Sequence, residues 1–321
     1  MKMRKCIFLF LACAGFATAA ESTCLYPELD GKKGKDILAE LHNRIADHDV
    51  LTYDQVRADK AKVDLRADGT VWDMYSSCTF ATYDYCGGNN YNTTIECDCY
   101  NREHVVPQSW WNNDNTQPMR TDLYNVIPTD NATNQQRGAW AYGEVAGEPE
   151  WSNDLGSKFG ETYTYTGGKN KKVFEPADQY KGDFARILFY MLTCYNDKNF
   201  TQAGQGYRMF TYSAYTSTAD FTSQALTLLL KWHRADAVSE KEQKRNDAVE
   251  RKQGNRNPFV DEPDLVEYIW GNKKNQTYAC GSSEAIDEVE AAPAAVKVLI
   301  NGTIYILRGD RKYTLTGLEV K

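Results

Sequence analysis

The residues best suited to chemistry lie in the run Asn101-Arg102-Glu103-His104-Val105-Val106-Pro107. The Glu103 carboxylate is a suitable ligand for a hard cation such as Mg²⁺. The neighbouring His104 imidazole can accept a proton near neutral pH, which a water molecule attacking phosphorus requires. An isolated Glu-His pair is more often a surface turn, so the chemical interpretation depends on what else the chain supplies.

The chain supplies a second polar segment downstream of this pair. It has four histidines, at positions 42, 48, 104 and 233, and His104 combines an acidic neighbour with the Asn-rich segment 122–137. The carboxamide oxygen of Asn134 is a neutral ligand that suits Mg²⁺, an ion that otherwise keeps several waters. Alone, Asn134 would be a turn or helix-capping residue. We interpret His233 as a polar group at the end of a core helix.

The N-terminal residues 1–20 have the pattern of a secretory signal. Basic residues at positions 2, 4 and 5 precede an apolar run over 6–16, and Ala17-Thr18-Ala19 forms a small-residue cleavage site. The apolar run is too short to cross a bilayer, and no other stretch is long and apolar enough to do so. We therefore expect an exported bacterial protein that is secreted, periplasmic or at the cell surface.

Seven cysteines follow the signal segment, at positions 24, 78, 86, 97, 99, 194 and 280. In an oxidising compartment they predict disulfides with one cysteine left over. A bridge within 78–99 would brace the Glu-His run, and a Cys24–Cys280 bridge would tie the domain ends together, although the pairing stays open. Cys97 and Cys99 are too closely spaced for the usual zinc motif.

Charge and composition divide the chain into regions. The net charge is −7, and removing the three basic signal residues makes it about −10, which argues against a broad basic surface for nucleic acid but not against a local basic cleft. We expect a main domain over 21–280, a small and acidic linker over 281–295, and a short β tail over 296–321. The tail resembles C-terminal segments of exported Bacteroidetes-type proteins, some of which act in sorting; an accessory β element is the alternative.

Apolar spacing and capping residues predict several helices in the main domain. They cover 35–46, 178–195, 222–233 and 239–253, the last with Ser239 as cap and Gly254 as stop. Residues 64–100 are rich in Tyr, Gly, Asn and Cys, which favours loops and short strands. The tail should form strands over 296–300, 304–308 and 313–316, with a hairpin turn at Asn301-Gly302.

Together these segments resemble the endonuclease I family of secreted bacterial nucleases, which have a ββα-metal (His-Me finger) active site. The resemblance covers about residues 35–271. It rests on the two segments above and, in the same order, on Tyr142–Val145, Val173–Asp178, Lys181–Arg186, Leu228–Arg234, Gln253–Phe259 and Glu267–Gly271. It implies an α+β fold, mainly helical, around a ββα-metal core. The flanks of Asn134 depart from the usual family pattern, although Asn134 and Arg137 keep their spacing.

The resemblance implies specific roles. His104 would be the general base, while Glu103 and Asn134 would hold one divalent cation, Mg²⁺ or else Mn²⁺ or Ca²⁺. Arg102, Arg120 and Arg137 are candidates for contacting phosphate, because arginine offers paired donors to it. Motif spacing favours Arg137 for a catalytic contact and leaves Arg102 and Arg120 as substrate-binding residues.

These roles predict a metal-dependent, sequence-nonspecific endonuclease that acts as a monomer. DNA is the first expected substrate and RNA the second. Its products would carry 5′-phosphate and 3′-hydroxyl ends. A phosphodiesterase acting on smaller esters is one alternative. A catalytically inactive surface protein that binds nucleic acid or glycans through its tyrosines and tryptophans is another, although such residues more often pack in the core.

Overall fold

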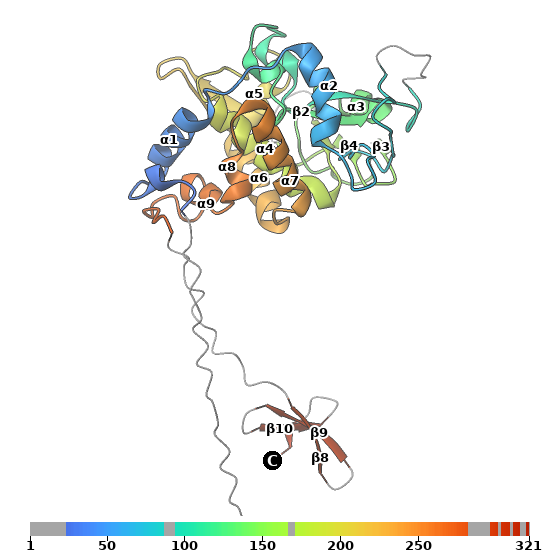
Figure 1. Ribbon diagram of the computed structural model, residues 1–321, viewed down its shortest axis with the longest axis vertical. Coiled ribbons are helices and arrows are strands. Elements are labelled where there is room, and N and C mark those ends of the chain that lie inside the picture. Colours follow the sequence, from blue (N-terminus) through green and yellow to red (C-terminus); the bar gives the residue numbers. More distant parts are fainter. Residues whose placement is uncertain are drawn as a thin grey trace, which may run out of the picture. The chain divides into compact units, whose positions relative to one another are not determined.

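The computed structural model describes residues 24–86, 94–165, 171–281, 296–300, 303–308, 311–314 and 319–320 (Figure 1). The chain divides into two compact units. One contains residues 28–278, and the other contains the two ends of the chain, 1–27 and 279–321. The predicted signal segment and most of the predicted linker lie outside the described residues.

The larger unit contains the helices that the sequence predicted. Helix α1 (Lys35–Ile45) buries Ile37, Leu38, Leu41 and Ile45 on one face, as expected from their spacing. Helix α4 (Lys181–Cys194) follows a 3-10 turn over Asp178–Tyr180 and is buried at every residue after the first. Helices α6 (Ser223–Ala235) and α7 (Glu240–Gln253) complete this set. Figure 1 shows α4 in the middle of the helical part, which makes it the core element.

Helix α2 (Tyr53–Val63) was not predicted. It begins with a capping box, in which Thr52 Oγ1 accepts from the Gln55 amide and Gln55 Oε1 accepts from the Thr52 amide. The short helices of this unit are α3 (Asn131–Arg137), α5 (Gly206–Met209), α8 (Pro258–Asp261) and α9 (Leu265–Ile269). Additional 3-10 turns cover Pro27–Leu29, Gln108–Trp111 and Pro118–Arg120.

The strands of the larger unit form small antiparallel sheets. Strand β1 (Tyr100–His104) pairs with β2 (Val126–Asp130), and β4 (Lys158–Glu161) lies between β3 (Trp151–Ser152) and β5 (Lys172–Glu175). A hairpin joins β6 (Phe210–Ser213) to β7 (Thr218–Phe221). Helices together with small antiparallel sheets agree with the expected α+β class.

The other unit contains a sheet close to the one predicted for the tail. Its strands are β8 (Val296–Ile300), β9 (Thr303–Arg308), β10 (Arg311–Thr314) and β11 (Glu319–Val320), in the spatial order β11-β10-β9-β8. Residues Ile300 and Thr303 are paired across β8 and β9. The predicted turn residues 301 and 302 themselves lie outside the described part.

Disulfides join Cys24 to Cys280, Cys78 to Cys97 and Cys86 to Cys99, and Cys194 is a buried free thiol. The expected bridge between the domain ends and the expected bracing of 78–99 are thus both present. In the part of the chain that the structure describes, no helix has the length and apolar character needed to span a bilayer.

Candidate active site

A two-stranded sheet and the helix after it position the Glu-His pair. Strand β1 ends at His104, and Val126 of β2 lies opposite it in the antiparallel register. Helix α3 begins directly after β2 and carries Asn134 and Arg137. The two sequence segments singled out above therefore meet in one local unit.

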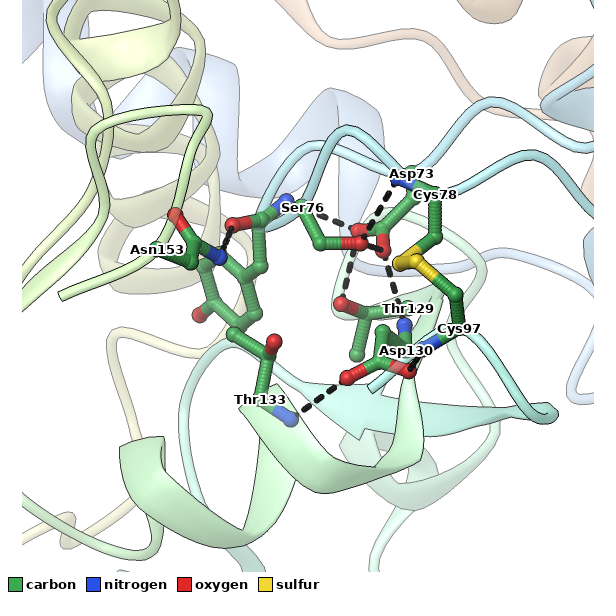
Figure 2. Close-up of a disulfide and its surroundings, with 9 residues drawn as sticks. Asp73, Ser76, Cys78, Cys97, Thr129, Asp130, Thr133 and Asn153 are labelled. Atoms are coloured by element: carbon green, nitrogen blue, oxygen red, sulfur yellow. Dashed lines mark hydrogen bonds between the residues drawn. A yellow bond between two sulfur atoms is a disulfide. The ribbon is translucent and has the colours of Figure 1, made fainter. Parts of the chain in front are cut away.

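The junction between β2 and α3 is held by two aspartates (Figure 2). Asp130 caps the helix, since one carboxylate oxygen accepts from the Thr133 amide at 2.7 Å and the other accepts from the Cys97 amide at 2.9 Å. The fully buried Asp73 accepts from the Thr129 hydroxyl at 2.7 Å and from the Asp130 amide at 2.8 Å. Because the Cys78–Cys97 disulfide covers this junction, the bridge helps to fix α3 relative to β1.

The His104 ring is buried, and its two nitrogens differ in their partners. Nε2 lies 3.0 Å from the Arg120 carbonyl oxygen, whereas Nδ1 has only a long contact of 3.5 Å with the Gln108 amide nitrogen. Since a carbonyl can only accept, the proton of the neutral ring is on Nε2 and the lone pair is on Nδ1. Burial, helped by the positive charges of Arg102 and Arg120, lowers the pKa of His104 to about 4. The imidazole is therefore neutral at ordinary pH, and its Nδ1 lone pair carries no proton.

The Glu103 carboxylate makes a separate set of contacts. Adjacent strand residues point to opposite faces, so Glu103 and His104 leave β1 on different sides. Glu103 Oε1 accepts from the Tyr75 hydroxyl at 2.9 Å and lies 2.7 Å from Arg137 Nε. Burial raises the pKa of Glu103 to about 7, against the lowering effects of Arg137 and Tyr75. These contacts hold the carboxylate in one orientation. Burial makes its ionised form unfavourable, and a nearby cation would reduce that free-energy cost.

Arg137 is fully buried and engaged on every side. Besides Glu103, its guanidinium donates to the carbonyl oxygens of Gly138, Trp140 and Val105 at 2.9, 3.0 and 2.8 Å. These contacts tie the C-terminal end of α3 to the end of β1. Motif spacing predicted that Arg137 contacts phosphate. Its buried position instead favours a role in orienting Glu103.

Asn134 lies against the strand that carries the Glu-His pair. Its Nδ2 donates to the Arg102 carbonyl oxygen at 3.1 Å, and this bond leaves the amide oxygen available as a ligand. Asn134 and Arg137 thus join α3 to β1 on the two sides of Glu103 in the sequence. Glu103, His104 and Asn134 thus belong to one β1–α3 unit, in which Glu103 and His104 leave β1 on opposite faces.

Arg102 and Arg120 lie on the His104 side of the strand. Arg102 precedes His104 by two residues and so shares its face. Arg120 supplies the carbonyl that accepts from the His104 ring. Both guanidiniums lie over the ring of Tyr53, with their Cζ atoms 3.9 and 4.0 Å from its centroid.

Sequence reasoning missed the tyrosines that surround this unit. The Tyr75 hydroxyl, which donates to Glu103, also lies 2.6 Å from the Tyr142 hydroxyl, and Arg137 lies over the Tyr142 ring at 4.7 Å. Tyr142 falls within a segment that carries the family resemblance, so the sequence could have identified it. For Tyr53 the signal was the capping box that starts α2, while nothing in the local sequence pointed to Tyr75.

A second cluster contains residue types that also bind metals. Ligand atoms of His48, Asp122 and Cys194 all lie within 4.8 Å of one another. Asp122 Oδ2 accepts from the hydroxyls of Tyr190 and Tyr195 at 2.8 and 2.7 Å, and His48 Nε2 lies 2.8 Å from the same Tyr195 hydroxyl. Because these groups already form hydrogen bonds within the core, we interpret the cluster as a structural network.

Comparisons with known proteins match most of the larger unit. The family model described as Endonuclease I matches residues 33–264. An extracellular ribonuclease of Bacillus amyloliquefaciens is 30% identical over 256 residues, covering 78% of this chain and 80% of the relative. The extracellular ribonuclease of Bacillus subtilis (strain 168) is 29% identical, covering 79% and 81%. Endonuclease-1 of Buchnera aphidicola subsp. Baizongia pistaciae is 24% identical, covering 68% and 86%.

Proposed function

The chain belongs to the endonuclease I family, and we propose that it is an exported nuclease that hydrolyses phosphodiester bonds within nucleic-acid strands. Export is supported by the three disulfides, which persist in oxidising compartments, and by relatives whose names describe extracellular enzymes. Nuclease activity is supported by the family and by the names of all three relatives.

The observation that carries the proposal is the orientation of the His104 ring. Its Nε2–H is bonded to the Arg120 carbonyl, so Nδ1 holds a lone pair that can take a proton from an attacking water. The positive charges of Arg102 and Arg120 beside it suit a phosphodiester. A base next to two cations is an arrangement that hydrolysis of a phosphate ester requires.

Glu103 and Asn134 fit a divalent cation, for which Mg²⁺ is the first choice and Mn²⁺ or Ca²⁺ the alternatives. The donor set is a carboxylate and a carboxamide oxygen, both hard ligands, and burial of Glu103 favours a partner of opposite charge. When bound, such an ion stabilises the negative charge that develops on the phosphate and the leaving oxygen. Tyr75 and Arg137 would hold Glu103 in place. We propose products with 5′-phosphate and 3′-hydroxyl ends.

The substrate we propose is DNA first and RNA second, cut without sequence preference. The charged groups near His104 are guanidiniums. They suit phosphate contacts, and such contacts carry no sequence information. RNA is included because two relatives are named ribonucleases. We propose that the protein acts as a monomer.

Two other functions must be distinguished from a nuclease by experiment. A catalytically inactive surface protein would bind through exposed aromatic residues; Trp110, Trp111, Trp232 and Trp270 are buried, whereas Tyr83, Tyr163, Tyr207 and Tyr215 are exposed. The remaining tryptophans, at positions 72, 140 and 151, are half-buried. A phosphodiesterase acting on small esters would share the site chemistry, so substrate length must distinguish it from a nuclease.

The test is a plasmid-nicking assay on the purified oxidised protein. Samples with Mg²⁺ should nick the plasmid and samples with EDTA should not, and His104→Ala should remove the activity. Parallel samples contain single-stranded DNA, RNA and a small phosphodiester. Turnover of the small ester alone would favour the phosphodiesterase, and no turnover with any divalent cation would favour the inactive binding protein.

A further inference from the structure

Tyr53 contacts two arginines that come from distant parts of the chain. It is the first residue of α2, Arg102 belongs to β1, and Arg120 ends a 3-10 turn. Both guanidiniums approach its ring to about van der Waals distance, with Cζ atoms 3.9 and 4.0 Å from the centroid. All three residues are half-buried, so each keeps some exposed surface.

The two arginines differ from three buried arginines of the larger unit in what they contact. Arg137, Arg186 and Arg245 each pair with a carboxylate at 2.5–2.8 Å. Among the residues that the structure describes, neither Arg102 nor Arg120 has an ion pair, and their guanidiniums contact the Tyr53 ring instead. Two cations without a carboxylate partner therefore lie beside His104.

An aromatic ring can hold cations together without consuming their donors. Each cation–π contact is attractive, more so when desolvated, and so offsets part of the repulsion between the two guanidiniums. A carboxylate in the same place would neutralise the charge and occupy the N–H groups. Tyr53 leaves both available for an anion.

We infer that Tyr53 is a positioning residue that holds Arg102 and Arg120 ready for two consecutive phosphates of one nucleic-acid strand, the scissile phosphate and a neighbour. This inference rests on the proposed nuclease function and refines its substrate class. A substrate with a single phosphodiester engages only one of the two arginines. The enzyme should therefore cleave a trinucleotide much better than a dinucleotide, regardless of base.

Three variants test the role of the ring. Tyr53→Leu removes the aromatic face, Tyr53→Phe keeps it and is the matched control, and the double variant Arg102→Gln/Arg120→Gln removes the charges directly. In Tyr53→Leu we expect KM for a DNA oligonucleotide to rise about tenfold with kcat within about twofold, since each arginine–phosphate contact is electrostatic. Tyr53→Phe should behave like the wild type. Adding Tyr53→Leu to the double variant should change KM no further.

Binding without cleavage gives a second readout. In EDTA, the affinity for a fluorescent single-stranded oligonucleotide is measured by anisotropy over a range of salt concentrations. Losing one or two phosphate contacts should reduce the slope of log K against log salt by about 0.7–1.4. A ring with a merely structural role would lower the melting temperature and leave KM and this slope unchanged, which would overturn the inference.

The outcomes separate this inference from the proposed function. If the wild type neither binds nor cleaves oligonucleotides, the nuclease proposal itself fails. If the wild type cleaves but treats di- and trinucleotides alike, or Tyr53→Leu matches Tyr53→Phe, the positioning role fails alone. If Tyr53→Leu does not fold, the double variant and the length dependence still test whether both arginines engage phosphates, because neither experiment alters the ring.

Discussion

Two clusters in this protein combine a histidine with an acidic residue, and they differ in how completely their polar groups are satisfied. At the His48 cluster, Asp122 Oδ1 accepts from the Tyr124 amide and from Gln253, and Oδ2 accepts from two tyrosines. At the His104 site, one ring nitrogen has only a 3.5 Å contact, and Arg102 and Arg120 have buried donors without partners.

The difference shows that residue type alone does not identify a site. Polar groups bonded to one another in a core stabilise the fold and have little capacity left for a substrate. Unsatisfied groups also occur in the scaffold, as at His233 Nδ1, so the His104 site is distinguished by the combination of a neutral imidazole with two neighbouring arginines that have no ion pair among the described residues. The predictions below test this distinction, from the largest expected effect to the smallest.

Replacing each histidine by alanine separates the clusters most sharply. His104→Ala should reduce nicking activity about 10²–10⁴-fold, the usual range for a positioned general base. His48→Ala should keep its activity and lose stability instead, by about 1–3 kcal/mol for the unfulfilled hydrogen bond of Tyr195. Nicking rates and thermal unfolding of both variants check this. Equal losses of activity would contradict the comparison.

The metal requirement should respond to residues of one cluster only. Glu103→Ala and Asn134→Ala each remove one oxygen ligand, so half-maximal activity should need about tenfold or more Mg²⁺, with partial recovery at high concentration. His48→Ala is the control and should titrate like the wild type. An unchanged titration in both site variants would remove Glu103 and Asn134 from the ligand set.

Removing one hydroxyl behind each cluster tests orientation. Tyr75→Phe keeps the packing of the ring against Phe174 and Phe184 but loses the bond to Glu103, so metal affinity should fall about 10-fold. Tyr190→Phe loses an equivalent bond to Asp122 and should leave metal affinity unchanged. Calorimetric titration with Mn²⁺ measures both. A similar fall in the two variants would show a general effect of packing.

The buried His233 lets us predict how the stability of the fold depends on pH. Burial, with a smaller contribution from Arg186, lowers the pKa of His233 to about 4. A depressed histidine pKa favours the neutral form in the fold, so this stability is present above pH 6.5 and is lost as the pH falls toward 4. Between pH 7 and 5 the loss should be on the order of 2 kcal/mol. Urea unfolding should show a loss between pH 7 and 5 that is about 2 kcal/mol smaller in His233→Gln than in the wild type, because His104, whose pKa is also lowered to about 4, titrates in both.

The sequence predicted those parts of the fold that local pattern determines. Helix α7 was predicted from Ser239 as cap and Gly254 as stop; in the structure Ser239 forms a capping box with Glu242, and Gly254 is left-handed. Helix α2 begins with the same kind of box at Thr52, but its residues are mostly polar and give little apolar periodicity. Its stability depends on packing, and so it was missed.

The site was only partly predictable for a similar reason. Glu103 and His104 are adjacent and Asn134 shares a local unit with them, so family motifs could identify all three. Tyr53 and Tyr75 reach the site through folding, across 49 and 28 residues from Arg102 and Glu103 respectively. Cys24–Cys280 was expected as a bridge between the domain ends, but the pairing within 78–99 stayed open, because it depends on distances between strands and loops that no spacing encodes.

Direct measurement of cation binding tests the central claim that the β1–α3 unit, and not the His48 cluster, is the chemical site. Mn²⁺ is titrated calorimetrically into the oxidised wild type, Glu103→Ala and His48→Ala. We predict a single bound ion in the wild type and in His48→Ala, and binding weakened about tenfold or more in Glu103→Ala. Binding that survives in Glu103→Ala but disappears in His48→Ala would contradict the account.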